Sequence, residues 1–289
     1  MELKFFHEQI FFATVRIVVA NQTATGASIG TGFLYRVPVT HDQSCILLVS
    51  NKHVYGDGRT PIQLVFHKRG LAQPNRPALG QTVTMQDRAF ESAYTTHPDP
   101  AVDLACINVS KIGDPSTSIF FKNLDDSLLA DFGHEHLLPG NDVWFVGYPE
   151  NRFDTKNNLP ILRRGCIASI PKVDFEGQQE FLIDAQVFQG SSGSPVFTTL
   201  GGAFKMIGAV AQTMIRNEKL QAVPTALALG ISQTIGLGIV LKSTLLKELL
   251  GAATQNIKER LSREKAEPTQ DTRTAGEQDA TPNAAPPHP

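Results

Sequence analysis

The stretch Gln189-Gly190-Ser191-Ser192-Gly193-Ser194-Pro195 decides which fold the chain is expected to adopt. It follows the apolar run 180–185, which is typical of a strand, and it holds Ser192 among small residues. Such a turn can expose a serine hydroxyl, while the backbone N–H groups of Gly190 and Ser192 point together toward a developing oxyanion. The simpler alternative is a Gly/Ser-rich hairpin loop without chemistry. A serine hydroxyl is a weak nucleophile, so the chemical interpretation requires a base and an acid elsewhere in the chain.

Both groups occur upstream of Ser192. The apolar run Ile46-Leu47-Leu48-Val49 leads into Ser50-Asn51-Lys52-His53, which predicts an imidazole at the end of a strand. Asp103 stands at the start of another apolar run, Leu104–Val109. Asp99 is a rival acid, but it lies between two prolines, where Asp commonly bonds its own backbone. We therefore favour Asp103 as the residue that orients His53.

The first 250 residues contain many short apolar runs separated by Gly, Pro, Asn and Asp, which predicts an all-β fold. The long spans 68–100 and 111–140 are expected to be surface loops. The expected strands are Ala13–Ala20, Gly32–Val37, Cys45–Asn51, Ile62–His67, Leu104–Val109, Val143–Gly147, Leu162–Ile170, Glu180–Ala185, Pro195–Thr198, Met206–Gln212 and Leu237–Leu241.

A single helix is expected at the end of the ordered chain. Ser243 can cap a run with leucines at helical spacing, so we predict a helix over about 243–262. Beyond Leu261 the chain has no Leu, Ile, Val or Phe and five prolines. Such a segment cannot bury enough apolar surface to offset ordering, so residues 264–289 are expected to be disordered.

Six short motifs, in this order and spacing, resemble the trypsin-like peptidases, and among them most closely the HtrA-type bacterial branch. The resemblance covers roughly residues 12 to 250. The motifs are Ile29-Gly30-Thr31-Gly32-Phe33, Ser50-Asn51-Lys52-His53-Val54, Asp103-Leu104-Ala105, Gly147-Tyr148-Pro149, Gly190-Ser191-Ser192-Gly193-Ser194-Pro195 and Leu237-Gly238-Ile239-Val240.

The resemblance implies a chymotrypsin-like fold of two six-stranded antiparallel β-barrels, at about 12–125 and 138–242, followed by the C-terminal helix. The protease domain would span 1–263, without a PDZ module. His53 and Asp103 would come from the first barrel and Ser192 from the second. The first specificity pocket would involve Gln186, Ala211 and Thr213. These side chains are neutral, so a preference for Lys or Arg before the scissile bond is not expected.

Three positions depart from the family pattern: Ser191, Ser194 and Ala211. Ser191 replaces an Asp or Asn, so it has no charge to pair with an inserted α-amino group. We therefore expect loops, in particular 111–140 and 213–236, to organise the oxyanion site, with an activating protein partner as one way to do so. Weaker or conditional catalysis is the expected consequence.

Bulk properties exclude several other classes. The formal net charge of -2 gives no field that would attract nucleic acid. The three cysteines are far apart and the first residues lack an apolar signal sequence, so a reducing cytoplasm is expected. Leu220–Leu241 is uncharged, but Pro224 and three glycines argue against a membrane helix and favour loop and strand. His134-Glu135-His136 lacks a third ligand, so neither metal nor cofactor is expected.

These observations together predict a serine endopeptidase that acts on polypeptides through an acyl-enzyme. A protease-fold protein that binds a partner, with little proteolysis of its own, is the alternative.

Overall fold

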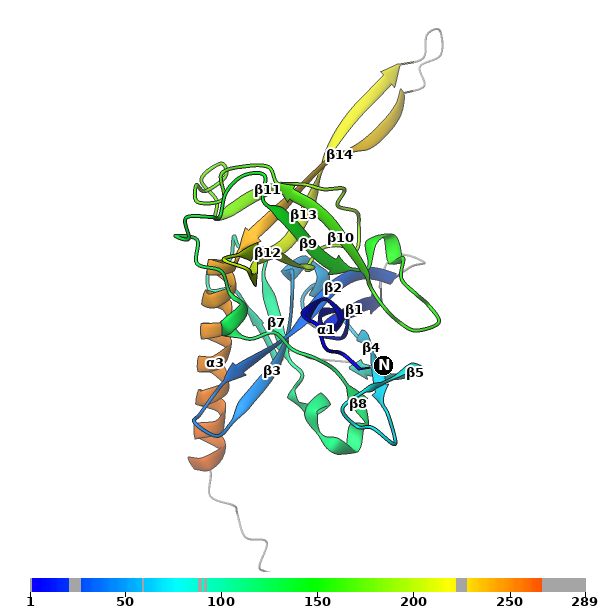
Figure 1. Cartoon of the computed structure of the whole chain (residues 1–289), viewed down its shortest axis with the longest axis vertical. Helices are drawn as coiled ribbons and strands as arrows, with labels where there is room; N and C mark the ends of the chain where they lie inside the picture. The colour runs from blue at the N-terminus through cyan, green and yellow to red at the C-terminus, as the bar shows by residue number, and fades with distance from the viewer. Residues whose placement is uncertain are drawn as a thin grey trace, which may run out of the picture.

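The computed structural model describes residues 2–20, 27–58, 60–87, 90, 93–221 and 228–266. Figure 1 shows two β-structured parts along the long axis, a long helix beside them and a two-stranded hairpin that projects from one end. The N-terminal part is an eight-stranded sheet, and the C-terminal part is a closed barrel of six strands.

The N-terminal sheet has the strand order β5-β4-β1-β2-β3-β7-β6, and β8 pairs with β4 outside this order. The strand pairings between its described residues are all antiparallel. The strands are β1 (Thr14–Ala20), β2 (Ala27–Pro38), β3 (Ser44–Ser50), β4 (Ile62–Arg69), β5 (Pro77–Asp87), β6 (Tyr94–Thr96), β7 (Ala105–Asn108) and β8 (Ile119–Phe120).

The C-terminal barrel closes in the order β10-β11-β14-β13-β12-β9. Its strands are β9 (Asp142–Gly147), β10 (Ile161–Ile167), β11 (Glu180–Asp184), β12 (Pro195–Leu200), β13 (Ala203–Gln221) and β14 (Ala228–Lys242). The α-helices are α1 (Phe6–Ala13), α2 (Lys52–Tyr55) and α3 (Ser243–Ala266). Short 3-10 turns occur at Ser110–Gly113, Pro115–Thr117, Asp126–Leu128 and Pro149–Asn151.

Residues 33–35 of β2 and 46–49 of β3 are apolar and buried on both faces of the sheet. Successive side chains of a strand point to opposite faces. Accordingly, Phe33 and Val49 join a core shared with α3 and the C-terminal barrel, whereas Leu34 and Leu48 join the interior of the N-terminal sheet. This arrangement ties the two β-structured parts together next to the end of β3, where His53 follows.

The two longer helices cover the body through their apolar sides. In α3, Leu245, Leu246 and Leu249 are buried at helical spacing. The helix α1 was not expected from the sequence. It begins where the Glu8 carboxylate accepts hydrogen bonds from the N–H groups of Lys4 and Phe5, at 2.9 and 3.1 Å.

Each expected strand overlaps a strand of the structure, and the C-terminal helix begins at Ser243 as expected. The expected first barrel differs. It is an eight-stranded sheet in which no pairing of described residues joins β5 to β6, so the strand pairing does not close.

The span 68–100 is not only loop, since it contains β5 and β6. In β5, Thr82, Thr84 and Gln86 face solvent and Val83 and Met85 are half-buried on the other face, so only two apolar residues mark its period of two. The span 111–140 holds the short strand β8 and 3-10 turns.

The uncharged stretch 220–241 lies mostly in β14, and its residues 222–227 are outside the described part. No helix in the described ranges is long and apolar enough to span a bilayer. The helix α3 continues to Ala266, a few residues past the expected boundary at 264, because its last turns follow without a proline before Pro268. The rest of the expected disordered tail, 267–289, lies outside the described residues.

Candidate active site

His53 and Asp103 are joined by a two-point contact. The carboxylate Oδ2 lies 2.5 Å from His53 Nδ1, and Oδ1 accepts the His53 backbone N–H at 3.0 Å. The Asp103 carbonyl also accepts the Asn51 side-chain amide, at 2.8 Å. The short helix α2, which follows β3 after one residue, thus holds the imidazole by its backbone and by its ring. With Nδ1 occupied by the carboxylate, Nε2 is the ring nitrogen left to exchange a proton with a substrate-side group.

The half-buried Tyr94 lies near Asp103, and the buried Cys106 lies near Tyr94. Burial, with a smaller contribution from the Asp103 charge, raises the pKa of Tyr94 to about 12. Burial also raises the pKa of the Cys106 thiol to about 12. Both groups are therefore neutral near pH 7, and Cys106 behaves as a small apolar residue in the core.

The rival acid Asp99 is engaged in its own turn. Its carboxylate accepts the Ala101 N–H at 2.9 Å, and its N–H donates to His97 Nδ1 at 3.0 Å. No hydrogen bond between described residues links Asp99 to His53. The geometry thus favours Asp103 as the partner of His53.

The loop around Ser192 is shaped by two glycines with positive φ, +88° at Gly190 and +83° at Gly193. A Cβ at Gly193 would collide with the Thr31 carbonyl oxygen and the Ser50 hydroxyl. Only glycine fits there on both counts. The tight turn expected at Ser192 is therefore present, and its packing surface is the N-terminal sheet.

The amides of this loop divide into bound and free donors. Neither Gly190 N–H nor Ser192 N–H donates to an acceptor among the described residues. The Gln189 carbonyl accepts the Glu150 N–H at 2.6 Å, and because a trans peptide places C=O and N–H on opposite sides, the Gly190 N–H points away from Glu150. The other donors are bound to backbone carbonyls: Ser191 to Phe188, Gly193 to Val210 and Ser194 to Ser191.

Thr31 connects the two halves of the site, and it was not singled out as a functional residue from the sequence. It is fully buried. Its N–H donates to the Ser192 carbonyl at 2.9 Å, and its hydroxyl donates to the Gly190 carbonyl at 2.7 Å while accepting the Tyr148 N–H at 3.1 Å. Its own carbonyl accepts the Ser50 hydroxyl at 2.6 Å. The sequence signal that could have identified Thr31 is a hydroxyl side chain between two glycines in a buried strand.

Ser192 and His53 are not hydrogen-bonded to each other: no bond between described atoms joins Ser192 Oγ to the His53 ring. The His53 side chain is 53% exposed and Ser192 is half-buried, so both are accessible from solvent. Catalytic hydrogen bonds are often long when no substrate is bound.

The three expected pocket residues differ in exposure. Ala211 is buried in the core shared by the two parts, whereas Gln186 is exposed. Thr213 is half-buried, with a hydroxyl that has no hydrogen-bond partner among the described residues. The well-formed cavities along α3 contain none of the three. Their role as a pocket stays a prediction.

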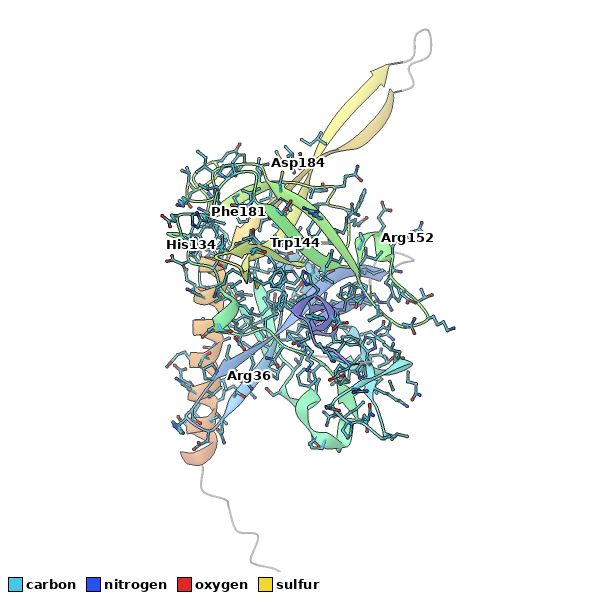
Figure 2. All side chains as sticks on the ribbon, in the orientation of Figure 1. Arg36, His134, Trp144, Arg152, Phe181 and Asp184 are labelled. Atoms are coloured by element: carbon cyan, nitrogen blue, oxygen red, sulfur yellow. The ribbon has the colours of Figure 1, made fainter. Side chains whose placement is uncertain are left out.

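The histidines His134 and His136 lie in a turn before β9, with ring centroids 5.6 Å apart. Figure 2 shows His134 at the outer edge of the body. The described residues contain no cluster of three His, Cys, Asp or Glu side chains that could hold a metal ion.

A family model described as the trypsin-like peptidase domain matches residues 30–204. This match covers more than half of the chain, and the chain therefore belongs to the trypsin-like peptidase family. Its fold is chymotrypsin-like, with one closed six-stranded barrel, an open sheet and a C-terminal helix. Family membership indicates a serine peptidase, a hydrolase whose substrates are polypeptides.

Solved structures with a similar chain course include several proteases. The serine endoprotease from Yersinia pestis has 15% identity and a TM-score of 0.49, over 88% of this chain and 68% of that one. The active form of the Rv3671c protease from M. tuberculosis has 19% identity and a TM-score of 0.45, over 84% and 82%. The thermostable serine protease AL20 from an extremophilic microorganism has 14% identity and a TM-score of 0.46, over 84% of this chain and 98% of that one. A search of curated proteins finds no match.

Proposed function

We propose that the chain is a serine endopeptidase with Ser192 as nucleophile, His53 as general base and Asp103 as the residue that orients the imidazole. The N–H groups of Gly190 and Ser192 form the oxyanion hole. The protease domain spans residues 1–263.

In this mechanism, Ser192 Oγ attacks the scissile carbonyl carbon while His53 Nε2 accepts the hydroxyl proton. The carbonyl oxygen becomes an oxyanion and accepts hydrogen bonds from the two free amides. As the C–N bond breaks, His53 returns the proton to the leaving amine, which gives an acyl-enzyme on Ser192. Water, deprotonated by His53, then attacks the ester and releases the acid. Asp103 stabilises the imidazolium that forms in both halves of the reaction.

The observation that carries the proposal is the selective pairing of the loop amides. Buried and turn amides in folded proteins are nearly always hydrogen-bonded. In the loop 190–194, the N–H groups of Ser191, Gly193 and Ser194 are bonded, whereas those of Gly190 and Ser192 have no acceptor among the described residues. Unpaired donors of this kind are what a developing oxyanion requires. The same loop is bonded through Thr31 to the strand that leads to His53.

A fluorophosphonate probe tests the proposal, because only an activated serine beside a usable oxyanion hole reacts quickly. We expect one equivalent of label on Ser192, located by peptide mapping. Ser191→Ala is a matched control, because it removes the adjacent hydroxyl, which has no partner, and leaves the reactive one. Labelling that persists in Ser192→Ala would show that the nucleophile is assigned wrongly.

A second candidate, a protease-fold protein that binds a partner without rapid turnover, has one observation in its favour. Ser192 Oγ and the His53 ring are not hydrogen-bonded among the described atoms. This candidate predicts negligible labelling of the chain alone. Labelling that rises when a protein partner is added would instead support an endopeptidase with an activating partner.

The free thiols Cys45, Cys106 and Cys166 are consistent with the cytoplasmic location that we propose. Cell fractionation with an antibody to the chain tests this location.

A further inference from the structure

His97 is a buried histidine that takes no part in the proposed mechanism. Its side chain is 1% exposed, and it lies directly after β6, at the start of the turn that carries Asp103. The ring nitrogen Nδ1 accepts the Asp99 N–H at 3.0 Å. A ring nitrogen that accepts a hydrogen bond carries no proton, so the proton of this imidazole is on Nε2.

The turn that carries Asp103 is held closed by His97. The His97 N–H donates to the Leu104 carbonyl at 2.9 Å, which joins the two ends of the turn. The ring binds the Asp99 N–H inside it. Asp103 lies between these two attachments, so the place of its carboxylate depends on the path that His97 gives to the turn.

The proton on His97 Nε2 has no hydrogen-bond acceptor among the described residues, although the ring is buried. Buried N–H groups are rarely left in this state, because an unpaired donor loses its bond to water. Glu248 of α3 lies beside it, with Oε2 at 3.5 Å from Nε2, which is close enough for an ion pair and slightly long for a hydrogen bond. The Glu248 side chain is 52% exposed, so it has room to move the roughly 0.5 Å that completes the bond.

The helix α3 is fixed against the strands that flank this turn. Figure 1 shows α3 running beside β7. Leu245 and Leu249 of the helix are buried in the same core as Leu104. Further along the helix, the Asn256 side-chain amide donates to Thr95 Oγ1 of β6 at 3.5 Å. Because the backbone of α3 is held in this way, the Glu248 carboxylate stays within reach of the His97 ring.

The other neutral tautomer of His97 would release the turn. With the proton on Nδ1, the ring would present a donor to the Asp99 N–H, which is also a donor, and the bond between them would be lost. The tautomer of a histidine is set by the partner of its second ring nitrogen. A carboxylate next to Nε2 keeps the proton there.

We propose that His97 and Glu248 are positioning residues for Asp103. Glu248 accepts the Nε2 proton and so holds the imidazole in the tautomer whose Nδ1 binds the turn. The inference rests on the proposed function and deepens it. The chain then has two histidine–carboxylate pairs in series: the pair at His53 reacts, and the pair at His97 supports the acid of the first. Through the second pair the C-terminal helix contributes to the reaction.

Glu248→Ala tests the proposal at an exposed position, where the change should not disturb folding. We expect kcat for a peptide p-nitroanilide ending in valine to fall by about five- to tenfold with KM unchanged, because Asp103 stabilises the imidazolium and does not bind substrate. The rate of fluorophosphonate labelling of Ser192 should fall in parallel. Glu259→Ala is the matched control: it removes the same charge from the same helix, and its carboxylate accepts only the Gln255 side-chain amide of α3 among the described residues.

Two substitutions at His97 separate its two ring nitrogens. An Asn oxygen lies near the place of Nδ1 and can still accept the Asp99 N–H, whereas the end of a Gln side chain lies near Nε2 and leaves that N–H unbonded. We expect His97→Gln to lower kcat by about 100-fold and His97→Asn by less than about tenfold. In the His97→Asn background Glu248→Ala should have no further effect, because Asn has no tautomer to hold. Circular dichroism checks folding, and the Glu248→Ala comparison stands if a His97 variant does not fold.

The Asp103→Asn background distinguishes positioning from a general loosening of the fold. If Glu248 acts through Asp103, Glu248→Ala should change the labelling rate of Asp103→Asn by less than about twofold. Proton NMR gives an independent signature, since the low-field resonance of the His53 Nδ1 proton reports on its bond to Asp103. This resonance should shift or broaden in Glu248→Ala and stay in place in Glu259→Ala.

The outcomes separate the two proposals. Labelling of Ser192 in the parent chain, with equal rates in Glu248→Ala and Glu259→Ala, would overturn the positioning role and leave the endopeptidase intact. The same loss from Glu248→Ala in the parent and in Asp103→Asn would overturn it too, because the effect would not pass through Asp103. No labelling of Ser192 in the parent chain would overturn both.

Discussion

On the N-terminal sheet, His53 and Asp103 are held by hydrogen bonds that their own side chains make, whereas on the C-terminal barrel Ser192 is held by the backbone of its neighbours. The first arrangement depends on two side chains and fails when either is replaced. The second depends on the path of a loop that Thr31 fastens to the other half. The two halves should therefore respond differently to substitution. Replacing His53 or Asp103 should lower activity without lowering stability, whereas loosening the loop at Ser192 should lower both.

The largest effect is expected from the groups that react. Ser192→Ala and His53→Ala should each lower turnover by about 10⁴-fold or more, because each removes a participant in proton transfer or bond formation. Their melting temperatures should stay close to that of the parent chain, since neither side chain is buried. Peptide hydrolysis and thermal unfolding measure the two quantities, and near-native proteolysis by either variant would refute the assignment.

Asp103→Asn should cost up to about 10⁴-fold in turnover, because an amide no longer holds the imidazole in the right tautomer or stabilises its charged form. Asp99→Asn is the matched control, since Asp99 accepts the Ala101 N–H in a neighbouring turn and an Asn oxygen can still accept it. We expect the control to retain activity within about twofold. A larger loss for Asp99→Asn than for Asp103→Asn would reverse the assignment of the acid.

Thr31→Val should lower both activity and stability. The change keeps the shape but leaves the buried Tyr148 N–H and Gly190 carbonyl without a partner, which costs about 1–3 kcal/mol. The loosened loop should reduce fluorophosphonate labelling by about 10- to 100-fold. Thr198→Val is the control, because the Thr198 side chain is also buried and its hydroxyl donates to the Asp142 carbonyl, a bond that the change removes. If labelling falls equally in both variants, Thr31 has no positioning role of its own.

A smaller effect is expected on the choice of the residue before the scissile bond. We expect cleavage after small or medium apolar residues to exceed cleavage after Lys or Arg by about tenfold or more, because the expected pocket residues are neutral and a buried cation would lack a partner. A library of peptides with one varied position before the scissile bond measures the ratio. Dominant cleavage after Arg would show that an acidic group lines the pocket.

The sequence predicted the elements whose signal is local. His53, Asp103 and the loop at Ser192 stand at ends of strongly apolar strands, and the glycines at 190 and 193 mark a tight turn. The strand β5 was not predicted from the sequence, because only one of its faces is partly buried. The helix α1 was not predicted from the sequence, because Phe6 packs on Phe197 and Phe204, which lie almost two hundred residues further along the chain.

The role of Thr31 and the pattern of free amides could not be predicted for a related reason. Both depend on hydrogen bonds between segments far apart in sequence, such as 31 with 190 and 150 with 189. The length of β13 was not predicted either, because its residues 213–221 are mostly polar and give no regular alternation from which pairing could be inferred.

The smallest effect concerns pH and the N-terminal sheet alone. His67, on β4, is 5% exposed and packs against Phe12 with ring centroids 4.7 Å apart. Burial lowers its pKa from 6.5 to about 4, although a hydrogen bond with the Asn158 backbone opposes this shift. Below pH 6.5 the unfolded chain therefore binds a proton that the folded chain refuses. The stability that neutral His67 provides is complete above pH 6.5 and is lost as the pH falls toward 4.

Between pH 7.5 and 5.0 this linkage removes about 2 kcal/mol from the free energy of unfolding. His67→Gln cannot titrate, so its stability should fall by that much less over the same interval, whatever the other groups contribute. Urea unfolding at both pH values gives the difference by circular dichroism. Fluorescence of Trp144, the only tryptophan of the chain, reports on β9 of the barrel and shows whether the two parts unfold together. Equal losses in the parent and in His67→Gln would mean that His67 is protonated in the folded chain, so burial would not be the force that sets its charge.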